Sequence, residues 1–249
     1  MTPHDLLAAF ETLAEAPNGI ARLRELILQL AVRGKLVPQD PNDEPACMLL
    51  ERIAVEKARL VKEGKISKTK PLPPVDEDEV PFAVPEEWVW CRAEYLFEFV
   101  TSGSRGWAQF YSKDGPVFLR IGNLDYGTTR LDLSNVQHVY PPANSEGTRT
   151  RTMPGDILVS ITGDTGMVGL IPDGLGEAYI NQHIAMCRPV IGTLPRYIAM
   201  AFTTPPLLDQ LWGYQRGIKN SLGLDDIRIL QCPSLPLQNN TVSSPRSTP

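Results

Sequence analysis

The sequence predicts an α+β protein, with two helices at its amino-terminal end and then a mostly β domain that includes one further helical stretch. In the first quarter of the chain, apolar residues recur at steps of three and four, the spacing of one helix face. Beyond residue 81, short apolar segments alternate with Gly, Asp, Asn and Pro, as strands and turns do. Residues 194–214 return to helical spacing around a break at Pro205-Pro206, and this helix is expected to cover one face of the sheet.

The two amino-terminal helices are expected to form an αα-hairpin within residues 1–70. Gly34 follows the last turn of the first helix, and the second helix runs from near Pro45 to Gly64. Each apolar stripe is too narrow to fold alone, so the helices should pack on each other or on a helix of a partner. The candidate partner-binding residues are Leu23, Leu26, Leu30, Leu50, Ile53 and Leu60.

A linker is expected at residues 71–85, because this stretch lacks periodicity and is rich in proline and acidic residues. The β domain would then occupy residues 86–236, and the Ser/Thr/Pro-rich residues 237–249 are expected to be a disordered tail. Strand-like segments lie at residues 117–121, 136–140, 157–161 and 167–171. The last two should form a hairpin, since Gly163 and Gly166 supply the positive φ that a tight turn needs.

Charge and composition limit the classes of function. The formal net charge of −5 argues against a general polyanion binder, because such proteins usually carry a basic excess. The acidic residues concentrate before residue 88, however, and many basic residues follow, so a local basic face is compatible with the sequence. The basic residues of this later part include Arg105, Arg120, Arg130, Arg149, Arg151, Arg188, Arg216 and Lys219.

The amino terminus has no basic patch leading into an apolar stretch, and no apolar run is long enough to cross a bilayer, so a cytoplasmic protein is expected. The four cysteines, Cys47, Cys91, Cys187 and Cys232, lie far apart and form no C-x-x-C pair. Neither zinc nor disulfides are therefore expected, and the thiols should be reduced and partly buried.

Several enzyme classes lack residues that they need. The glycine-rich residues 163–169 are not followed by Gly-Lys-Ser/Thr, so a hairpin turn is favoured over a phosphate loop. Asp173 and Glu177 are reminiscent of nuclease carboxylates, but Tyr179 stands where a lysine is expected. There is no G-x-S-x-G nucleophile turn and no glycine-rich strand-turn-helix for S-adenosylmethionine. An unrecognised nuclease stays as a minor alternative to a non-catalytic protein.

Three segments carry side chains that are suited to nucleic acid. Residues 101–107 place Arg105 and Trp107 among glycines, where a loop can approach phosphate closely. Residues 181–183 and 214–221 cluster Asn, Gln, His, Arg and Lys side chains, which make paired hydrogen bonds to base edges. A solvated loop or a structural turn is the competing explanation for each segment.

Taken together, these segments resemble the specificity subunit of Type I restriction-modification enzymes. The helical part of the resemblance lies in residues 26–45 (LILQLAVRGKLVPQDPNDEP), 49–51 and 63–65. Residues 81–82 (PF) and 85–90 (PEEWVW) are similar to the entry into that family's target recognition domain. Residues 155–160 (GDILVS), 181–183 (NQH) and 217–221 (GIKNS) are similar to its interior.

The resemblance implies a recognition domain that docks in the major groove of double-stranded DNA, and helices that set spacing and bind the modification subunit. Chemistry would belong to the partners, with S-adenosylmethionine for adenine methylation and ATP and Mg²⁺ in the restriction subunit. Arg105 and Lys219 are expected to contact phosphate or guanine, and Gln182, His183, Gln215 and Asn220 to read bases. The full set of candidate DNA-binding residues is Ser104, Arg105, Trp107, Arg120, Asn123, Thr162, Asp164, Thr165, Asn181, Gln182, His183, Gln215, Arg216, Lys219, Asn220 and Ser221.

The carboxyl end departs from the family pattern. Members usually continue into a long helix and often a second recognition domain, whereas residues 232–238 run here into Asn239-Asn240 and a polar tail. The expectation is a chain truncated after one recognition domain, which specifies half of a split target and needs a second specificity chain or dimerisation. The alternative is a truncated scaffold that binds the modification subunit without reading DNA.

Overall fold

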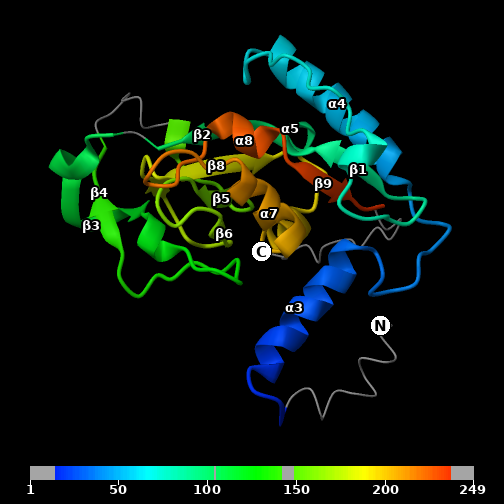
Figure 1. Cartoon of the computed structure of the whole chain (residues 1–249). Coiled ribbons are helices and arrows are strands. Elements are labelled where there is room, and N and C mark those ends of the chain that lie inside the picture. Colours follow the sequence, from blue (N-terminus) through cyan, green and yellow to red (C-terminus); the bar gives the residue numbers. More distant parts are fainter. Residues whose placement is uncertain (1–14, 104, 142–148, 237–249) are drawn as a thin grey trace, which may run out of the picture.

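A computed structural model describes residues 15–103, 105–141 and 149–236 and confirms the α+β class (Figure 1). The helices are α3 (Gly19–Val32), α4 (Ala46–Lys62), α5 (Ala93–Leu96), α6 (Pro195–Phe202), α7 (Pro205–Gly213) and α8 (Leu224–Arg228), with 3-10 turns at Glu77–Glu79, Trp107–Phe110 and Ile121–Asn123. The strands are β1 (Val89–Arg92), β2 (Phe97–Ser102), β3 (Tyr111–Leu119), β4 (Gln137–Val139), β5 (Ile157–Ser160), β6 (Val168–Leu170), β7 (Ala178–Ile180), β8 (Ile184–Pro189) and β9 (Gln231–Ser234).

Both amino-terminal helices form, and both end at the predicted glycines. Gly34 and Gly64 have φ of 66° and 69°, the left-handed conformation that glycine adopts most readily. After α3 the Lys35 amide donates to the Leu30 carbonyl at 2.8 Å, and after α4 the Lys65 amide donates to the Leu60 carbonyl at 2.9 Å. Each helix therefore closes with hydrogen bonds that satisfy its last carbonyls.

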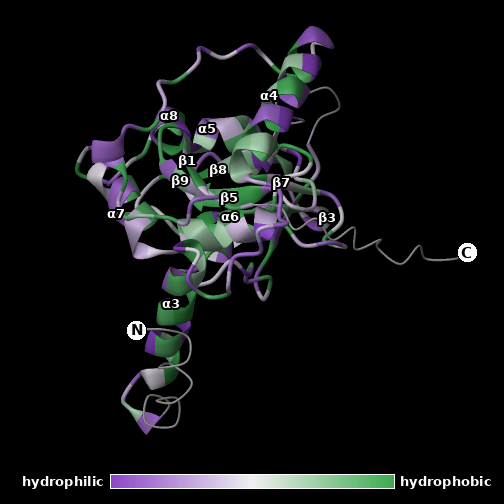
Figure 2. Ribbon diagram, turned by 90° about the vertical axis from the view of Figure 1, so that its right-hand side faces the viewer, coloured by the Kyte–Doolittle hydropathy of each residue, from purple (hydrophilic) through white to green (hydrophobic). Residues whose placement is uncertain are grey.

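The two helices do not pack side by side as the expected hairpin. They project from opposite sides of the strands in both ribbon views (Figures 1 and 2). Val32 of α3 and Leu49 and Ile53 of α4 instead join the main core, which also contains Phe97 and Phe202 of the β-rich part. The last residue of α3 and the first half of α4 are thus packed against the β-rich part rather than against each other.

In the described residues the strands form three sheets. The largest has the order β2-β8-β5-β6, a second has the order β4-β3-β7, and β1 pairs with β9. The predicted hairpin is confirmed, because β5 and β6 pair antiparallel with Leu158 opposite Gly169. β8 was not among the predicted strands; it lies between β2 and β5, and its residues 184–187 are all buried. Such a central strand has no polar face, so alternation does not reveal it.

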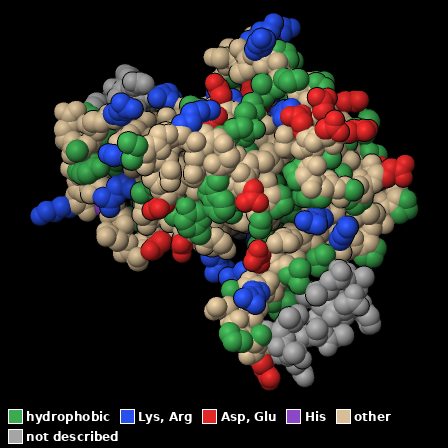
Figure 3. All heavy atoms as spheres, viewed as in Figure 1, with side chains coloured by type: hydrophobic (Ala, Val, Ile, Leu, Met, Phe, Trp, Pro, Cys, Tyr) green, Lys and Arg blue, Asp and Glu red, His purple; other side chains and the backbone are tan. Residues whose placement is uncertain are grey.

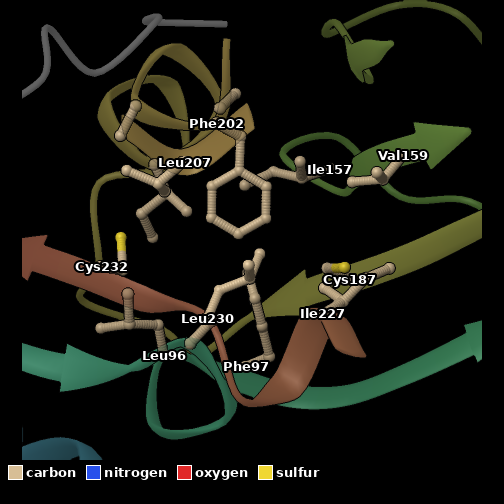
Figure 4. Close-up of a cluster of buried hydrophobic side chains, with 14 of the residues drawn as sticks. Leu96, Phe97, Ile157, Val159, Cys187, Phe202, Leu207, Ile227, Leu230 and Cys232 are labelled. Carbon is tan, nitrogen blue, oxygen red and sulfur yellow. The ribbon is translucent and has the colours of Figure 1, made fainter. Parts of the chain in front are cut away.

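The helical stretch predicted at residues 194–214 forms two helices, α6 and α7. The break between them lies at Pro205-Pro206, as expected. Pro205 begins α7, where a missing amide hydrogen costs nothing. In Figure 4 the Phe202 ring lies between Leu207 and Ile157 and points toward Leu230. The two ribbon views place the strands of this core at the centre, and Figure 2 shows them mainly in the hydrophobic colour.

The region expected to be a linker is held against the fold at several points. The Tyr95 hydroxyl donates to the Leu72 carbonyl at 2.6 Å, and the Arg92 guanidinium donates to the carbonyl of Pro74 at 3.3 Å and to Glu79 at 2.6 Å. The domain boundaries at residues 70 and 86 stay a prediction. The expected tail at 237–249 lies outside the described residues.

Candidate nucleic-acid interface

The loops that carry the predicted DNA-binding residues emerge at one end of the two larger sheets. β3 and β7 run parallel with Leu119 opposite Ile180, so the loops after both strands begin at the same edge. β8 is antiparallel to β2 and β5, which places its first residue, Ile184, opposite Ser160 at the end of β5. Strand direction therefore brings the loops after β2, β3, β5 and β7 together.

Backbone hydrogen bonds tie these loops to one another. The Asn181 amide donates to the Leu119 carbonyl at 3.0 Å, which fixes the loop after β7 to the end of β3. The Ile161 amide donates to the His183 carbonyl at 2.9 Å, which fixes the same loop to the end of β5. These contacts make one continuous surface from segments that lie far apart in the sequence.

The loop after α7 joins this surface through the turn between β5 and β6. The Gly163 amide lies 3.0 Å from the Lys219 carbonyl and 2.9 Å from the Asn220 carbonyl, and Thr162 forms an antiparallel bridge with Ser221. We call the assembled region the loop surface. It comprises residues 101–103, 105–107, 120–123, 161–165, 181–183 and 214–221, and Ser104 lies outside the described residues.

Gly103 is the position at which the loop after β2 approaches the loop after β7. A Cβ atom on Gly103 would lie 2.1 Å from the Ile180 carbonyl oxygen and 2.3 Å from the Asn181 carbonyl carbon. Only glycine allows this approach, because any side chain would collide with backbone atoms that the sheet holds in place. Gly103 therefore sets where Arg105 stands on the loop surface.

The loop at residues 216–221 has a fixed backbone. Arg216 and Ser221 exchange backbone hydrogen bonds at 3.0 and 2.9 Å, and the Asn220 amide donates to the Gly217 carbonyl at 3.2 Å across the tip. Two nitrogens of the Arg216 guanidinium bind the buried Asp226 carboxylate at 2.9 and 2.6 Å. Such a paired contact holds the base of the loop and neutralises the Arg216 charge.

Thr165 is a buried attachment point beneath the loop surface rather than a residue open to a ligand. Its carbonyl accepts hydrogen bonds from the Trp212 indole at 3.2 Å and the Tyr126 hydroxyl at 3.0 Å, and its hydroxyl accepts one from Gln215. Burial raises the pKa of Tyr126, and the carboxylate of Asp164 raises it further. Trp212 and Tyr126 could not be assigned to this region from the sequence, because nothing local signals that both donate to the Thr165 carbonyl.

The loop surface carries the cations Arg105, Arg120 and Lys219, and Asp164 is an exposed acid on it. Arg105 and Lys219 are exposed, Arg120 is half-buried, and none of the three has an ionic partner within the described part of the chain. Figure 3 shows Lys and Arg side chains over the left-hand end of the molecule and the densest group of Asp and Glu at its upper right. The negative net charge therefore does not describe the local field at this end.

Two curated proteins of Escherichia coli are similar to this chain. The Type I restriction enzyme EcoEI specificity subunit is 54% identical over 219 residues, which is 85% of this chain and 36% of the relative. The EcoAI specificity subunit is 44% identical over 178 residues, or 72% of this chain and 29% of the relative. The chain is related to Type I restriction specificity subunits. It spans about a third of the length of these relatives.

Solved structures of Type I restriction-modification proteins are also similar to this chain. The HsdS subunit of Thermoanaerobacter tengcongensis matches with a TM-score of 0.44 at 16% identity, covering 94% of this chain and 46% of that one. A chain from a structure of Type I restriction-modification complex assembly matches with a TM-score of 0.45 at 17% identity, covering 94% of this chain and 47% of that one. No protein-family model matches the chain.

Trp107 and Asn123 are among the candidate DNA-binding residues of this chain that are buried, which corrects the expectation that they face DNA. The Trp107 ring is 6% exposed and stacks on Phe118 with ring centroids 5.4 Å apart. The Asn123 side chain is also buried, and its amide donates to the Asp132 carbonyl at 2.8 Å. An apolar environment around Trp107 and satisfied hydrogen bonds at Asn123 explain both placements structurally.

The other predicted residues divide by depth. Thr165 and Asn181 are buried, and the Asn181 side chain accepts a hydrogen bond from the His183 amide at 3.1 Å. Residues that are exposed or half-buried on the loop surface are Arg105, Arg120, Thr162, Asp164, Gln182, His183, Gln215, Arg216, Lys219, Asn220 and Ser221. Their contact with DNA stays a prediction.

The candidate partner-binding residues largely serve the chain's own packing. Leu23, Leu30, Ile53 and Leu60 are buried, while Leu26 is half-buried. Leu50 is partly buried against the main core. Their contact with a partner stays a prediction.

Metal-binding residues do not gather in the described part of the chain, where no group of three or more His, Cys, Asp or Glu could hold an ion. The carboxylate of Glu177 accepts a hydrogen bond from the Tyr179 hydroxyl at 2.6 Å and lies 3.7 Å from the Arg151 guanidinium. Burial and this carboxylate raise the pKa of Tyr179 to about 12.

Among the described helices, none is long and apolar enough to span a membrane.

Proposed function

We propose that this chain is a sequence-specific DNA-binding part of a Type I specificity subunit and that it does no chemistry itself. The observation that carries this proposal is the loop surface, where separate polar loops meet with cations that have no partner in the described residues. Fixed loops position side chains for base edges, and unpaired cations lower the cost of approaching phosphates. The similarity to the two specificity subunits supports the same function.

The division of labour follows from that proposal. Double-stranded DNA binds the loop surface, and the modification and restriction subunits of a cytoplasmic complex bind elsewhere. S-adenosylmethionine, ATP and Mg²⁺ act in those subunits. One recognition domain reads one half-site, so a split target requires a second domain or a second specificity chain.

The test is selection of duplexes from a randomised library at fixed salt, followed by affinity measurements on the enriched half-site across a salt series. Arg105→Ala and Lys219→Ala should each weaken binding, and the slope of log affinity against log salt should become shallower by about 0.9 per lost phosphate contact. The matched control is Arg196→Ala, because Arg196 is exposed on α6 next to Gly155, near the opposite end of β5.

Three outcomes are informative. Enrichment with the expected loss in both variants and not in the control supports the proposal. Unchanged affinity and salt slope in both variants would mean that the binding face lies elsewhere. Stable association with the modification subunit without enrichment of any half-site would support the alternative of a scaffold that does not read DNA.

A further inference from the structure

Ile218 is an apolar side chain where the fold gives it nothing to contact. It is the most exposed large hydrophobic residue of the described chain, with 105% of its reference surface open to solvent. It stands at the tip of the 216–221 loop, with Gly217 before it and Lys219 after it. A side chain in this position adds nothing to the core.

The loop holds its shape without help from Ile218. The hydrogen bonds between Arg216 and Ser221 close its base, the bond from the Asn220 amide to the Gly217 carbonyl closes its tip, and Gly163 binds it from the side. The ion pair to Asp226 anchors the base from below. Because Ile is branched at Cβ, its side chain is stiff as well, so little freedom is lost when a partner covers it.

The surroundings indicate the chemistry of what Ile218 meets. Gln182, His183 and Asn220, on the same loop surface, carry hydrogen-bonding groups suited to base edges in an intact groove. The thymine C5-methyl group is the apolar feature that a base pair presents among the donors and acceptors of the major groove. The exposed Ile218 side chain, beside these hydrogen-bonding side chains, is complementary to a groove that presents a methyl group among donors and acceptors.

We propose that Ile218 contacts the methyl group of a thymine in the recognised half-site and so contributes to specificity at that base pair. This inference rests on the proposed function. Burying one carbon group contributes about 0.8 kcal/mol, and a tenfold change in affinity corresponds to about 1.4 kcal/mol. Loss of one buried methyl contact should therefore weaken binding about fourfold.

The experiment is a double-mutant cycle between protein and DNA. Each thymidine of the selected half-site is replaced in turn by deoxyuridine, which removes only the methyl group. The wild-type chain should lose about fourfold in affinity at one position. Ile218→Ala should bind the thymidine and deoxyuridine duplexes at that position equally, whereas Ile218→Val should keep part of the discrimination.

The matched control is Ile191→Ala, since Ile191 is 80% exposed just beyond β8, at the end of that strand opposite the loop surface. This control should discriminate as the wild type does. If deoxyuridine is tolerated at every position, or if Ile218→Ala discriminates as well as the wild type, the methyl contact is wrong while the DNA-binding function stands. If the wild-type chain enriches no half-site at all, the proposed function fails and this inference falls with it.

Discussion

At the scale of single residues, burial decides what a side chain is able to do. Trp107 and Lys219 both belong to the set that composition assigns to nucleic acid, yet Trp107 stacks inside the fold and Lys219 is exposed. The four cysteines show the same division. Cys47 is exposed, whereas Cys91, Cys187 and Cys232 are buried.

The buried thiols should resist alkylation. Burial raises the pKa of Cys91 to about 12 and raises that of Cys187 and Cys232 too, so these groups stay protonated near pH 8 and the reactive thiolate is rare. Mass spectrometry after brief iodoacetamide treatment of the folded chain should find label on Cys47. Comparable labelling of Cys91 at the same pH would contradict the buried placement, and a denatured sample labelled at all four positions is the control.

At the scale of elements, local backbone conformation determines where a helix ends. Packing around the terminal glycine determines how well that position tolerates a side chain. Gly34 and Gly64 end α3 and α4 with nearly the same backbone conformation. Their surroundings differ, however. A Cβ on Gly34 would lie 2.6 Å from the ring of Pro85, while a Cβ on Gly64 would meet nothing within 4 Å.

Substituting Gly34 and Gly64 by alanine distinguishes the cost of a left-handed backbone from the cost of a steric clash. Gly64→Ala should lower the free energy of unfolding by about 1 kcal/mol, the cost of a left-handed backbone at a residue with a Cβ. Gly34→Ala should lower it by about 1–3 kcal/mol more, because the new methyl group overpacks against Pro85. Urea unfolding of both variants measures the difference. Equal losses would show that the contact between the end of α3 and Pro85 is not rigid.

At the scale of the whole molecule, the amino-terminal helices and the β-rich part share one core. Ile53 of α4 is 2% exposed and belongs to the same cluster as Phe97 and Phe202. Val55, two residues further along α4, is 71% exposed. The stability of α4 is therefore coupled to that of the sheets.

Ile53→Ala should lower the free energy of unfolding by about 2–5 kcal/mol and shift the whole transition. Val55→Ala on the same helix is the control and should change it by less than about 0.5 kcal/mol. Far-ultraviolet circular dichroism and tryptophan fluorescence should report the same midpoint. A separate early loss of helix signal in Ile53→Ala, with fluorescence unchanged, would mean that α4 unfolds independently.

Features that depend on neighbouring residues could be predicted from the sequence alone. The glycines at 34 and 64, the hairpin of β5 and β6, and the helix break at Pro205 all follow from local φ preferences and periodicity, and the structure agrees. The motifs also predicted a relation to Type I specificity subunits, and the similarity to the EcoAI and EcoEI subunits supports that relation.

The grouping of the polar loops at one end of the molecule, by contrast, depends on the tertiary fold. Strand direction brings together the loops that contain Gly103, Asn181 and Gly163, although these loops are distant in sequence, and it places Asn123 inside. It also separates α3 from α4, whose residues Val32, Leu49 and Ile53 pack in the core with the β-rich part. Local periodicity contains no information on these long-range contacts, which depend on how whole elements bury their apolar faces.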